Sequence, residues 1–332
     1  MSFLFLRTVG SIVITGGTGF VGSHLIRRLF LSEQKRLERI VIIDNSNKLP
    51  KGHIPGLNAI PFDNKDLTVY QEDMRHGEAI SDILRGEKPI DIFIHLAARG
   101  NVLDTNIDPQ EILDININGT RNVLDACSVN NVSRFIFASS AAVYGEAKKL
   151  PLSEDHPLVP ISNYGLSKAK AEALVSSYMS TGKIQSTISL RIFNIYGDGD
   201  QSGVTYRFSK RLSSGLAPVI YGDGNQVRDF ISVTDVVESI LLASDSKIGG
   251  EFNIGTGIPI TINDLARRMI SIYGLHIDPS YSPNDLGKNT KHNTQEIRNS
   301  YADIRKSAKL LNFTAQSDIA LELNEIRKKI SV

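Results

Sequence analysis

The sequence predicts an α/β fold: a doubly wound parallel sheet with helices on both faces, joined to a smaller α/β lobe. Two observations support this prediction. In residues 1–193, short apolar runs rich in β-branched residues alternate with stretches whose apolar residues recur at helical spacing. Such runs are typical of parallel strands, which are buried on both faces. After residue 193 the alternation stops, so we expect 194–230 and 255–332 to form the smaller lobe. Residues 231–254 are expected to return to the sheet, as a helix at 231–245 and a strand at 251–254.

A glycine-rich turn joins the first predicted strand, residues 11–15, to the first predicted helix, residues 20–31. Gly16, Gly19 and Gly22 repeat at every third position through this turn. Strand, glycine turn and helix together are the arrangement that binds the pyrophosphate of a dinucleotide. The glycines let the backbone approach the phosphates, and the helix N-terminus supplies N–H donors. An ordinary tight turn is the alternative interpretation, which the flanking strand and helix disfavour.

The second predicted strand, residues 39–43, ends at Asp44. This carboxylate follows Gly22 by about 20 residues, the separation at which an acidic residue binds the ribose hydroxyls of a dinucleotide. A carboxylate there would repel a 2′-phosphate, so the sequence predicts NAD rather than NADP as the cofactor. The alternative is a solvated strand end.

These motifs resemble the extended branch of the short-chain dehydrogenase/reductase superfamily, the NAD-dependent nucleotide-sugar epimerases and dehydratases. The resemblance runs through nearly the whole chain and implies a Rossmann fold. It places Asp73 beside the adenine, residues 95–98 at the fourth strand beside the cofactor, and Asn116 at a backbone distortion near the active site. The expected cofactor-binding residues outside the catalytic helix are Gly16, Gly19, Phe20, Val21, Gly22, Asp44, Asn45, Asp73, Met74, Leu96, Ala97, Ala98 and Asn116.

A second motif places Tyr164 and Lys168 one helical turn apart, on a helix expected to begin near Ser162 or Asn163. A free tyrosine has a pKa of about 10 and is a poor base at neutral pH. Lys168, helped by the positive charge of a nicotinamide, would favour the phenolate and lower that pKa, so that Tyr164 could act as a general base. Lys168 would also hold the nicotinamide ribose. Taken alone, a Tyr-x-x-x-Lys spacing is more often a solvated helix face.

A predicted strand at residues 134–139 delivers two neighbouring hydroxyls, Ser139 and Ser140. The resemblance selects Ser140, because the family's catalytic hydroxyl stands four residues before the tyrosine of a Val-Tyr-Gly, here Tyr144. The expected catalytic residues are therefore Ser140, Tyr164 and Lys168, and Tyr164 and Lys168 complete the cofactor set.

Ala141 and Ala142 follow the catalytic hydroxyl, where family dehydratases carry an acidic pair; family decarboxylases carry a glutamate nearby. Alanine does no acid or base chemistry, so elimination lacks its catalyst. The resemblance then implies C4 epimerisation of a UDP-hexose through a transient 4-keto intermediate, with NAD retained. The alternatives are a nucleotide-sugar 4-keto reductase or dehydrogenase with exchangeable cofactor, and a dinucleotide-sensing regulator that kept the fold.

The resemblance also implies the residues that bind the UDP-sugar. Asn194 and Arg228 would contact the diphosphate, and Val204, Val219 and Tyr221 would line the uracil. Arginine suits a diphosphate because its planar fork pairs with two oxygens. The simpler interpretation of Arg228 is a surface ion pair with Asp229.

Three further positions bear on the sugar. By the same resemblance, Ser300 and Gly100 are small where a large side chain narrows the hexose pocket of some family members, which would leave room for an N-acetyl group. Many relatives have an arginine where this chain has Asn293, and Lys291 or Arg298 would substitute for it. The expected substrate-binding residues are Gly100, Ser140, Tyr164, Asn194, Val204, Val219, Tyr221, Arg228, Arg298 and Ser300.

Composition sets the remaining bounds. A formal charge of +1 gives no electrostatic case for nucleic acid or membrane binding. Cys127, the one cysteine, is expected to pack in the core, and no metal site is expected. The apolar run at residues 3–6 is too short to span a bilayer, so we expect a cytoplasmic protein. The helices expected at 111–130 and 164–181 each have a second apolar face, and by resemblance these faces would pair two subunits into a homodimer.

Overall fold

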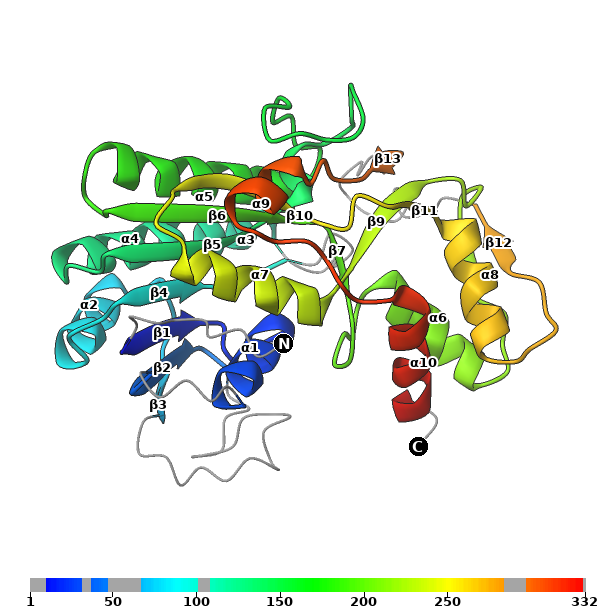
Figure 1. Ribbon diagram of the computed structural model, residues 1–332, viewed down its shortest axis with the longest axis horizontal. Helices are drawn as coiled ribbons and strands as arrows, with labels where there is room; N and C mark the ends of the chain where they lie inside the picture. The colour runs from blue at the N-terminus through cyan, green and yellow to red at the C-terminus, as the bar shows by residue number, and fades with distance from the viewer. Residues whose placement is uncertain (1–9, 32–36, 47–66, 101–107, 284–296, 331–332) are drawn as a thin grey trace.

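The computed structural model describes residues 10–31, 37–46, 67–100, 108–283 and 297–330 (Figure 1). Its centre is a parallel sheet of seven strands in the order β10-β6-β5-β4-β1-β2-β3. The strands are β1 (Ser11–Thr15), β2 (Arg39–Asp44), β3 (Leu67–Gln71), β4 (Ile92–His95), β5 (Arg134–Ser140), β6 (Ser186–Ile192) and β10 (Gly250–Ile254). The strands β1 to β3 are added towards one edge of the sheet and the strands from β4 onwards towards the other, so the strand order reverses between β1 and β4. Dinucleotides bind at such a point, at the carboxyl ends of the strands.

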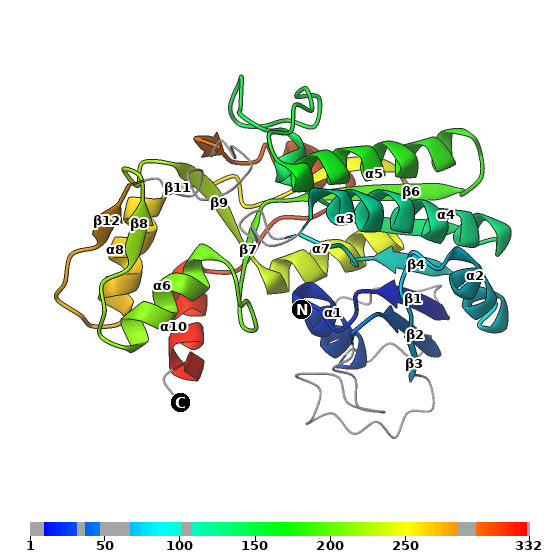
Figure 2. The same ribbon diagram turned by 180° about the vertical axis from the view of Figure 1, so that it is seen from behind.

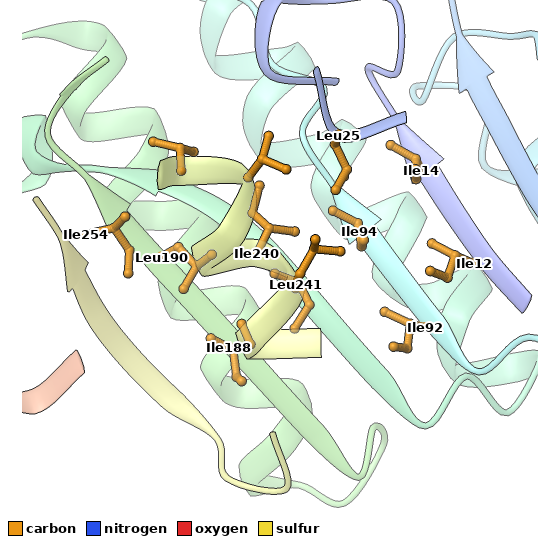
Figure 3. Close-up of a cluster of buried hydrophobic side chains, with 14 of the residues drawn as sticks. Ile12, Ile14, Leu25, Ile92, Ile94, Ile188, Leu190, Ile240, Leu241 and Ile254 are labelled. Carbon is orange, nitrogen blue, oxygen red and sulfur yellow. The ribbon is translucent and has the colours of Figure 1, made fainter. Parts of the chain in front are cut away.

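Helices cover both faces of this sheet (Figures 1 and 2). Residues of α1 (Phe20–Phe30) and α7 (Val233–Asp245) share one apolar cluster with alternate strand residues. Figure 3 shows Ile240 and Leu241 of α7 against the strand isoleucines in this cluster. Residues of α2 (Gly77–Gly86), α4 (Thr120–Val129) and α5 (Asn163–Ser180) share the second cluster with the other strand faces, and Cys127 is fully buried there. The predicted doubly wound fold is confirmed.

Most of the remaining segments form a lobe beside the large sheet, at the right of Figure 1. A four-stranded sheet and a two-stranded sheet pack here with three helices around a separate apolar cluster. These elements are β7 (Asn194–Tyr196), α6 (Val204–Ser213), β8 (Val219–Tyr221), β9 (Val227–Ser232), β11 (Pro259–Thr261), α8 (Ile262–Ile272), β12 (Ser280–Ser282), β13 (Asn299–Ser300) and α10 (Ile319–Ile330). The short helix α9 (Arg305–Leu310) contacts β10 instead, and Leu311 and Phe313 join the core of the large sheet.

Strand β9 continues directly into α7. Ser232 ends the strand and caps the helix, because its hydroxyl oxygen accepts the N–H of Thr234 at 3.1 Å. The same hydroxyl donates to Glu322 of α10 at 2.7 Å. The helix expected at 231–245 therefore begins at Val233, since Ile231 and Ser232 still belong to the strand.

The single helix expected at 111–130 is divided into three parts. The short helix α3 (Pro109–Leu113) leads into a π-helical segment (Asp114–Gly119), and α4 follows. Asn116 lies in the π-helical segment, in agreement with the distortion that the resemblance implied there. Such segments are rare and are frequently found at functional sites.

Candidate active site

Ser140, Tyr164 and Lys168 meet at the carboxyl end of β5. Ser140 ends the strand, and its hydroxyl oxygen accepts the N–H of Ala142 at 3.2 Å. Tyr164 lies in the first turn of α5, which begins where Ser162 accepts the N–H of Gly165 at 3.0 Å, so the expected cap is confirmed. The side chains of Ser140 and Tyr164 are hydrogen-bonded, and the Lys168 ammonium lies 5.9 Å from the centre of the Tyr164 ring.

Burial dominates the titration of both helix residues. Lys168 is 3% exposed, donates to the carbonyl of Ala138 at 2.7 Å, and lies 4.8 Å from the centre of the Phe137 ring. Burial lowers the pKa of Lys168 to about 7, because the charged form loses its hydration. Burial likewise raises the pKa of Tyr164, and the hydrogen bond from Ser140 only partly opposes this change.

The expectation that Lys168 lowers the pKa of Tyr164 is therefore not met by the groups of the protein alone. Burial raises that pKa more than Ser140 lowers it, because desolvation, which cannot be read from the residue spacing, disfavours the phenolate. A neighbouring positive charge, such as that of the oxidised nicotinamide, is what the phenolate would still require.

The glycine turn has the shape that a pyrophosphate site needs. Gly16 has a φ of +72°, and a Cβ there would lie 2.7 Å from the backbone nitrogen of Ala97. A Cβ on Gly22 would lie 2.3 Å from the carbonyl oxygen of Gly16. Gly19 precedes α1, whose first turn has no side-chain cap and no acidic residue. The N–H groups of Phe20, Val21 and Gly22 are those that the helix leaves for an anion.

Asp44 lies at the end of β2 and supports this turn. Its carboxylate accepts the N–H of Thr18 at 3.0 Å and the N–H of Ser46 at 3.0 Å. The side chain is therefore held at the rim of the glycine turn, at the strand end where a ribose would be bound.

Asp73 and Asn45 come together beyond the ends of β3 and β2. The carboxylate of Asp73 accepts from the Asn45 amide at 3.4 Å and from the Arg75 guanidinium at 2.8 and 3.0 Å. The hydrogen bonds from Arg75 lower the pKa of Asp73 to about 2. Met74 is buried against Gly119, because a Cβ added to Gly119 would lie 2.7 Å from the Cγ of Met74. These residues form the side of the site expected to hold adenine.

The segment after β4 is tied to β1. Leu96 donates its N–H to the carbonyl of Thr15 at 3.2 Å, and Ala97 donates to the Thr15 hydroxyl at 3.4 Å. The segment continues through Ala98 towards the catalytic residues. The backbone beside the glycine turn is thereby fixed by its own hydrogen bonds.

Asn116 supports the site through the backbone rather than by facing it. Its amide oxygen accepts the N–H of Arg99 at 2.7 Å, and its amide nitrogen donates to the carbonyl of Arg99 at 2.7 Å and to Ser167 at 2.8 Å. Ser167 in turn donates to the carbonyl of Tyr164 at 2.7 Å. The π-helical segment therefore anchors both the segment after β4 and the first turn of α5.

His95 is fully buried between Thr15, 2.6 Å from Nδ1, and Thr120, 3.0 Å from Nε2. Burial, with a smaller contribution from Lys168, lowers the pKa of His95 to about 3, so the ring is neutral. Because Thr120 donates its own hydroxyl to the carbonyl of Asn116 at 2.6 Å, it accepts from His95, and the ring proton lies on Nε2. From the sequence, His95 was placed only within the motif beside the cofactor, and no contact of its side chain was predicted.

A cavity of about 360 Å³ opens beside Ser140 and Tyr164, between the large sheet and α6, β8 and β9. This volume is within the range of small-molecule sites. Eight of the predicted substrate residues line it: Ser140, Tyr164, Asn194, Val204, Val219, Tyr221, Arg228 and Ser300. Ala141 and Ala142 also line it, as expected for residues beside the reacting carbon.

Arg228 does not follow the simpler interpretation of an ion pair with Asp229. Its Nη1 donates to the carbonyl of Val227 at 2.8 Å, and its side chain lines the cavity. Asp229 is fully buried and accepts backbone N–H groups of Thr256 at 2.8 Å and Gly257 at 2.9 Å.

Two predicted substrate residues have different surroundings. Gly100 has a φ of +145°, and a Cβ there would lie 2.5 Å from Cδ2 of Tyr164, so the glycine makes room for the tyrosine ring. Arg298 forms a bidentate ion pair with Asp223 at 2.8 and 2.9 Å. Lys291 and Asn293 lie outside the described residues, as do residues 3–6.

Arg207 and Gln226 line the cavity, and sequence reasoning missed both. Arg207 lies on α6 among residues with amphipathic spacing, where an arginine is usually a solvated residue. Gln226 donates its amide to the carbonyl of Tyr221 at 3.0 Å, a contact that crosses the turn between β8 and β9. Its place two residues before the predicted residue Arg228 was the one signal available, since side chains two positions apart in an extended segment point to the same side.

Within the described residues, no group of three or more His, Cys, Asp or Glu side chains is arranged to hold a metal ion. Among the helices of those same residues, none combines the length and apolar character needed to cross a membrane.

The chain is similar to known proteins along most of its length. Its match to the family model described as the NAD dependent epimerase/dehydratase family covers residues 12–255. A putative UDP-glucose 4-epimerase of Methanocaldococcus jannaschii is 33% identical over 90% of this chain and 92% of the relative. A UDP-N-acetyl-alpha-D-glucosaminuronate decarboxylase of Bacillus cytotoxicus is 32% identical over 91% of each.

Among solved structures, the UDP-N-acetylglucosamine 4-epimerase of Methanobrevibacter ruminantium, in complex with UDP-N-acetylmuramic acid, superposes with a TM-score of 0.82. It is 30% identical and covers 96% of this chain and 97% of its own. The predicted resemblance is thus confirmed by sequence and by structure. Together with the glycine turn, Asp44 and the cluster at Ser140, these matches show that the chain belongs to the NAD dependent epimerase/dehydratase family.

Proposed function

We propose that this protein is an NAD-dependent isomerase that epimerises C4 of a UDP-hexose through a transient 4-keto intermediate. The observation that carries the proposal is that the expected cofactor site and the cavity meet at Ser140 and Tyr164. The glycine turn and the adenine side lead along the strand ends to Ser140, Tyr164 and Lys168, and the UDP-sugar cavity begins at Ser140 and Tyr164. A reacting carbon placed there would face both the cofactor and the base.

The protein groups have separate tasks in this reaction. Tyr164 takes the proton of the sugar O4 as a general base, and Ser140 holds the same oxygen by a hydrogen bond. Bound NAD supplies reversible hydride acceptance at C4. Lys168, one helical turn after Tyr164 on α5, would hold the nicotinamide ribose. The 4-keto sugar would turn over in the cavity, and return of the hydride to C4 and of the proton from Tyr164 to O4 would then give the epimer.

Ala141 and Ala142 favour epimerisation over the other reactions of the family. Both line the cavity, and neither can protonate a leaving group or remove a C5 proton. The decarboxylase relative shows that identity alone does not separate these reactions. The missing acid and base therefore decide against dehydration and decarboxylation.

We propose that the rest of the cavity recognises the UDP group and the sugar. Arg228 and Asn194 meet the diphosphate, and Val219 and Tyr221 flank the uracil. Ser300 is buried in the cavity wall at 5% exposure, and its small side chain leaves room for an N-acetyl group. UDP-N-acetylglucosamine is then accepted as well as UDP-glucose.

Two further parts of the proposal concern the protein in the cell. We propose a cytoplasmic homodimer, with α4 and α5 forming the contact between subunits. Val129 is 68% exposed at the end of α4, and Ala173 is exposed on α5, which supports an apolar contact. We also propose that residues 1–193 with 231–254 bind the cofactor, and that 194–230 and 255–332 bind the sugar.

The test is incubation of the purified protein with UDP-glucose, and separately with UDP-N-acetylglucosamine, without added NAD, followed by NMR of the sugar. The C4 epimer should appear, and Tyr164→Phe should abolish it, whereas Tyr206→Phe on α6 should not. Turnover only with NAD(H) consumed in proportion would instead identify the reductase. Absence of any turnover, with catalytic NAD⁺ supplied, would reject both reactions.

A further inference from the structure

A buried ion pair lies directly behind the catalytic residues. Glu172 stands one helical turn after Lys168 on α5, and Arg191 stands on β6 opposite Ser139, the residue before Ser140. The two side chains are 3% and 5% exposed. The Arg191 guanidinium donates to one Glu172 oxygen through Nη2 at 2.5 Å and through Nε at 3.0 Å.

The remaining atoms of the pair reach the neighbouring elements. The second carboxylate oxygen of Glu172 accepts the hydroxyl of Ser139 at 2.8 Å. Nη1 of Arg191 donates to the Tyr144 hydroxyl at 3.0 Å, and that hydroxyl donates to Asn253 of β10 at 2.6 Å. The pair therefore joins α5 to β5, β6 and β10, and to Tyr144, which ends the short turn that begins at Ser140.

Stability alone does not account for this arrangement. Two charges removed from water gain on average little over a well-packed apolar pair of the same volume, because desolvation offsets their attraction. What the pair provides is geometry. On one side, it fixes the peptide that leads into Ser140. On the other, it fixes the rotation of α5 about its axis, which sets the orientation of Tyr164 and Lys168.

We propose that Glu172 and Arg191 are positioning residues, which hold Ser140 in register with Tyr164 and Lys168 for the proton transfer. Neither side chain lines the cavity, so they act through the residues that do. The inference rests on the proposed function only in naming the transferred proton as that of the sugar O4. A misplacement of about 1 Å in such a cluster can lower the rate about 100-fold.

The experiment uses the double variant Glu172→Gln/Arg191→Met, because either single substitution would leave a buried charge without its partner. Ser139→Ala is the milder variant, since it removes one hydrogen bond to the pair. Ser239→Ala is the matched control, a fully buried serine on α7 whose hydroxyl donates to the carbonyl of Val236 at 2.7 Å.

We expect the double variant to melt within a few degrees of the wild type, with kcat lowered about 10- to 100-fold and with KM for the UDP-sugar and Kd for NAD nearly unchanged. Ser139→Ala should lower kcat less, and Ser239→Ala not at all. The positioning role is refuted if a stably folded double variant keeps the wild-type kcat. It is also refuted if the fall in kcat comes together with a higher KM for the UDP-sugar and weaker NAD binding.

A second measurement is independent of turnover. In protein labelled with 13C-tyrosine, the Tyr164 ring signal is assigned by its loss in Tyr164→Phe. That signal should shift in the double variant and in Ser139→Ala, and stay in place in Ser239→Ala. An unchanged signal overturns the inference. A wild type without epimerase activity rejects the proposed function alone, because the ring signal still reports whether the pair positions Tyr164.

Discussion

Lys168→Met should make the protein more stable at neutral pH while abolishing its activity. Burial lowers the pKa of Lys168 from 10.5 to about 7, so the folded protein disfavours the ammonium. This difference corresponds to a destabilisation of up to roughly 5 kcal/mol below pH 7, where both folded and unfolded states carry the charge. Between pH 7 and 10.5 the unfolded chain binds more protons, so the destabilisation falls as pH rises and vanishes above 10.5. Methionine keeps a similar length without the charge.

The assay is urea unfolding of the cofactor-free wild type and Lys168→Met, followed by circular dichroism at several pH values from 6.5 to roughly 10. The free energy of unfolding of the variant should exceed that of the wild type by several kcal/mol at pH 7. This difference should shrink by about 1.4 kcal/mol for each pH unit above 7. Saturating NAD should stabilise the wild type more than the variant, because Lys168 is expected to hold the nicotinamide ribose. A difference that stays constant with pH, or a less stable variant at pH 7, would refute the reasoning.

Three further outcomes are expected. Gly22→Ala should weaken NAD binding at least about tenfold by calorimetry, because its Cβ would lie 2.3 Å from the Gly16 carbonyl oxygen, whereas Gly86→Ala, with open space around it, should not. Asp44→Asn should lower the preference for NAD over NADP in binding titrations, since the carboxylate that repels a 2′-phosphate is lost. Ser300→Tyr should lower kcat/KM for UDP-N-acetylglucosamine more than for UDP-glucose; equal losses would contradict the assigned pocket wall.

The sheet was predictable because its signals are local. Each strand is an apolar run that must be buried on both faces, and a glycine turn followed by a helix marks the first crossover. The helix residues Tyr164 and Lys168 were predictable for the same reason, since four positions place two side chains on one face. The family resemblance then supplied Ser140 and six further residues that line the cavity: Asn194, Val204, Val219, Tyr221, Arg228 and Ser300.

What escaped prediction depends on contacts between distant residues. The Arg298–Asp223 ion pair joins segments far apart in the chain, and no spacing rule reveals it. The sequence likewise shows that Gly100 is small, but not that the Tyr164 ring fills the space. The pKa values of Tyr164 and Lys168 required burial to be known, because desolvation acts on both charges and sequence reasoning had only their attraction.

The junction of β9 and α7 has a mechanical consequence. Arg228 lies on a strand that continues into a helix of the sheet core without an intervening loop. Ser232 at this junction is hydrogen-bonded to Thr234 of α7 and to Glu322 of α10. Because β9 and α7 follow each other without a flexible joint, the cavity wall that carries Arg228 moves only if α7 slides over the sheet. Ligands of the cavity should therefore meet a preformed socket, and any adjustment to sugars of different size must come from the side chains and short segments that line it.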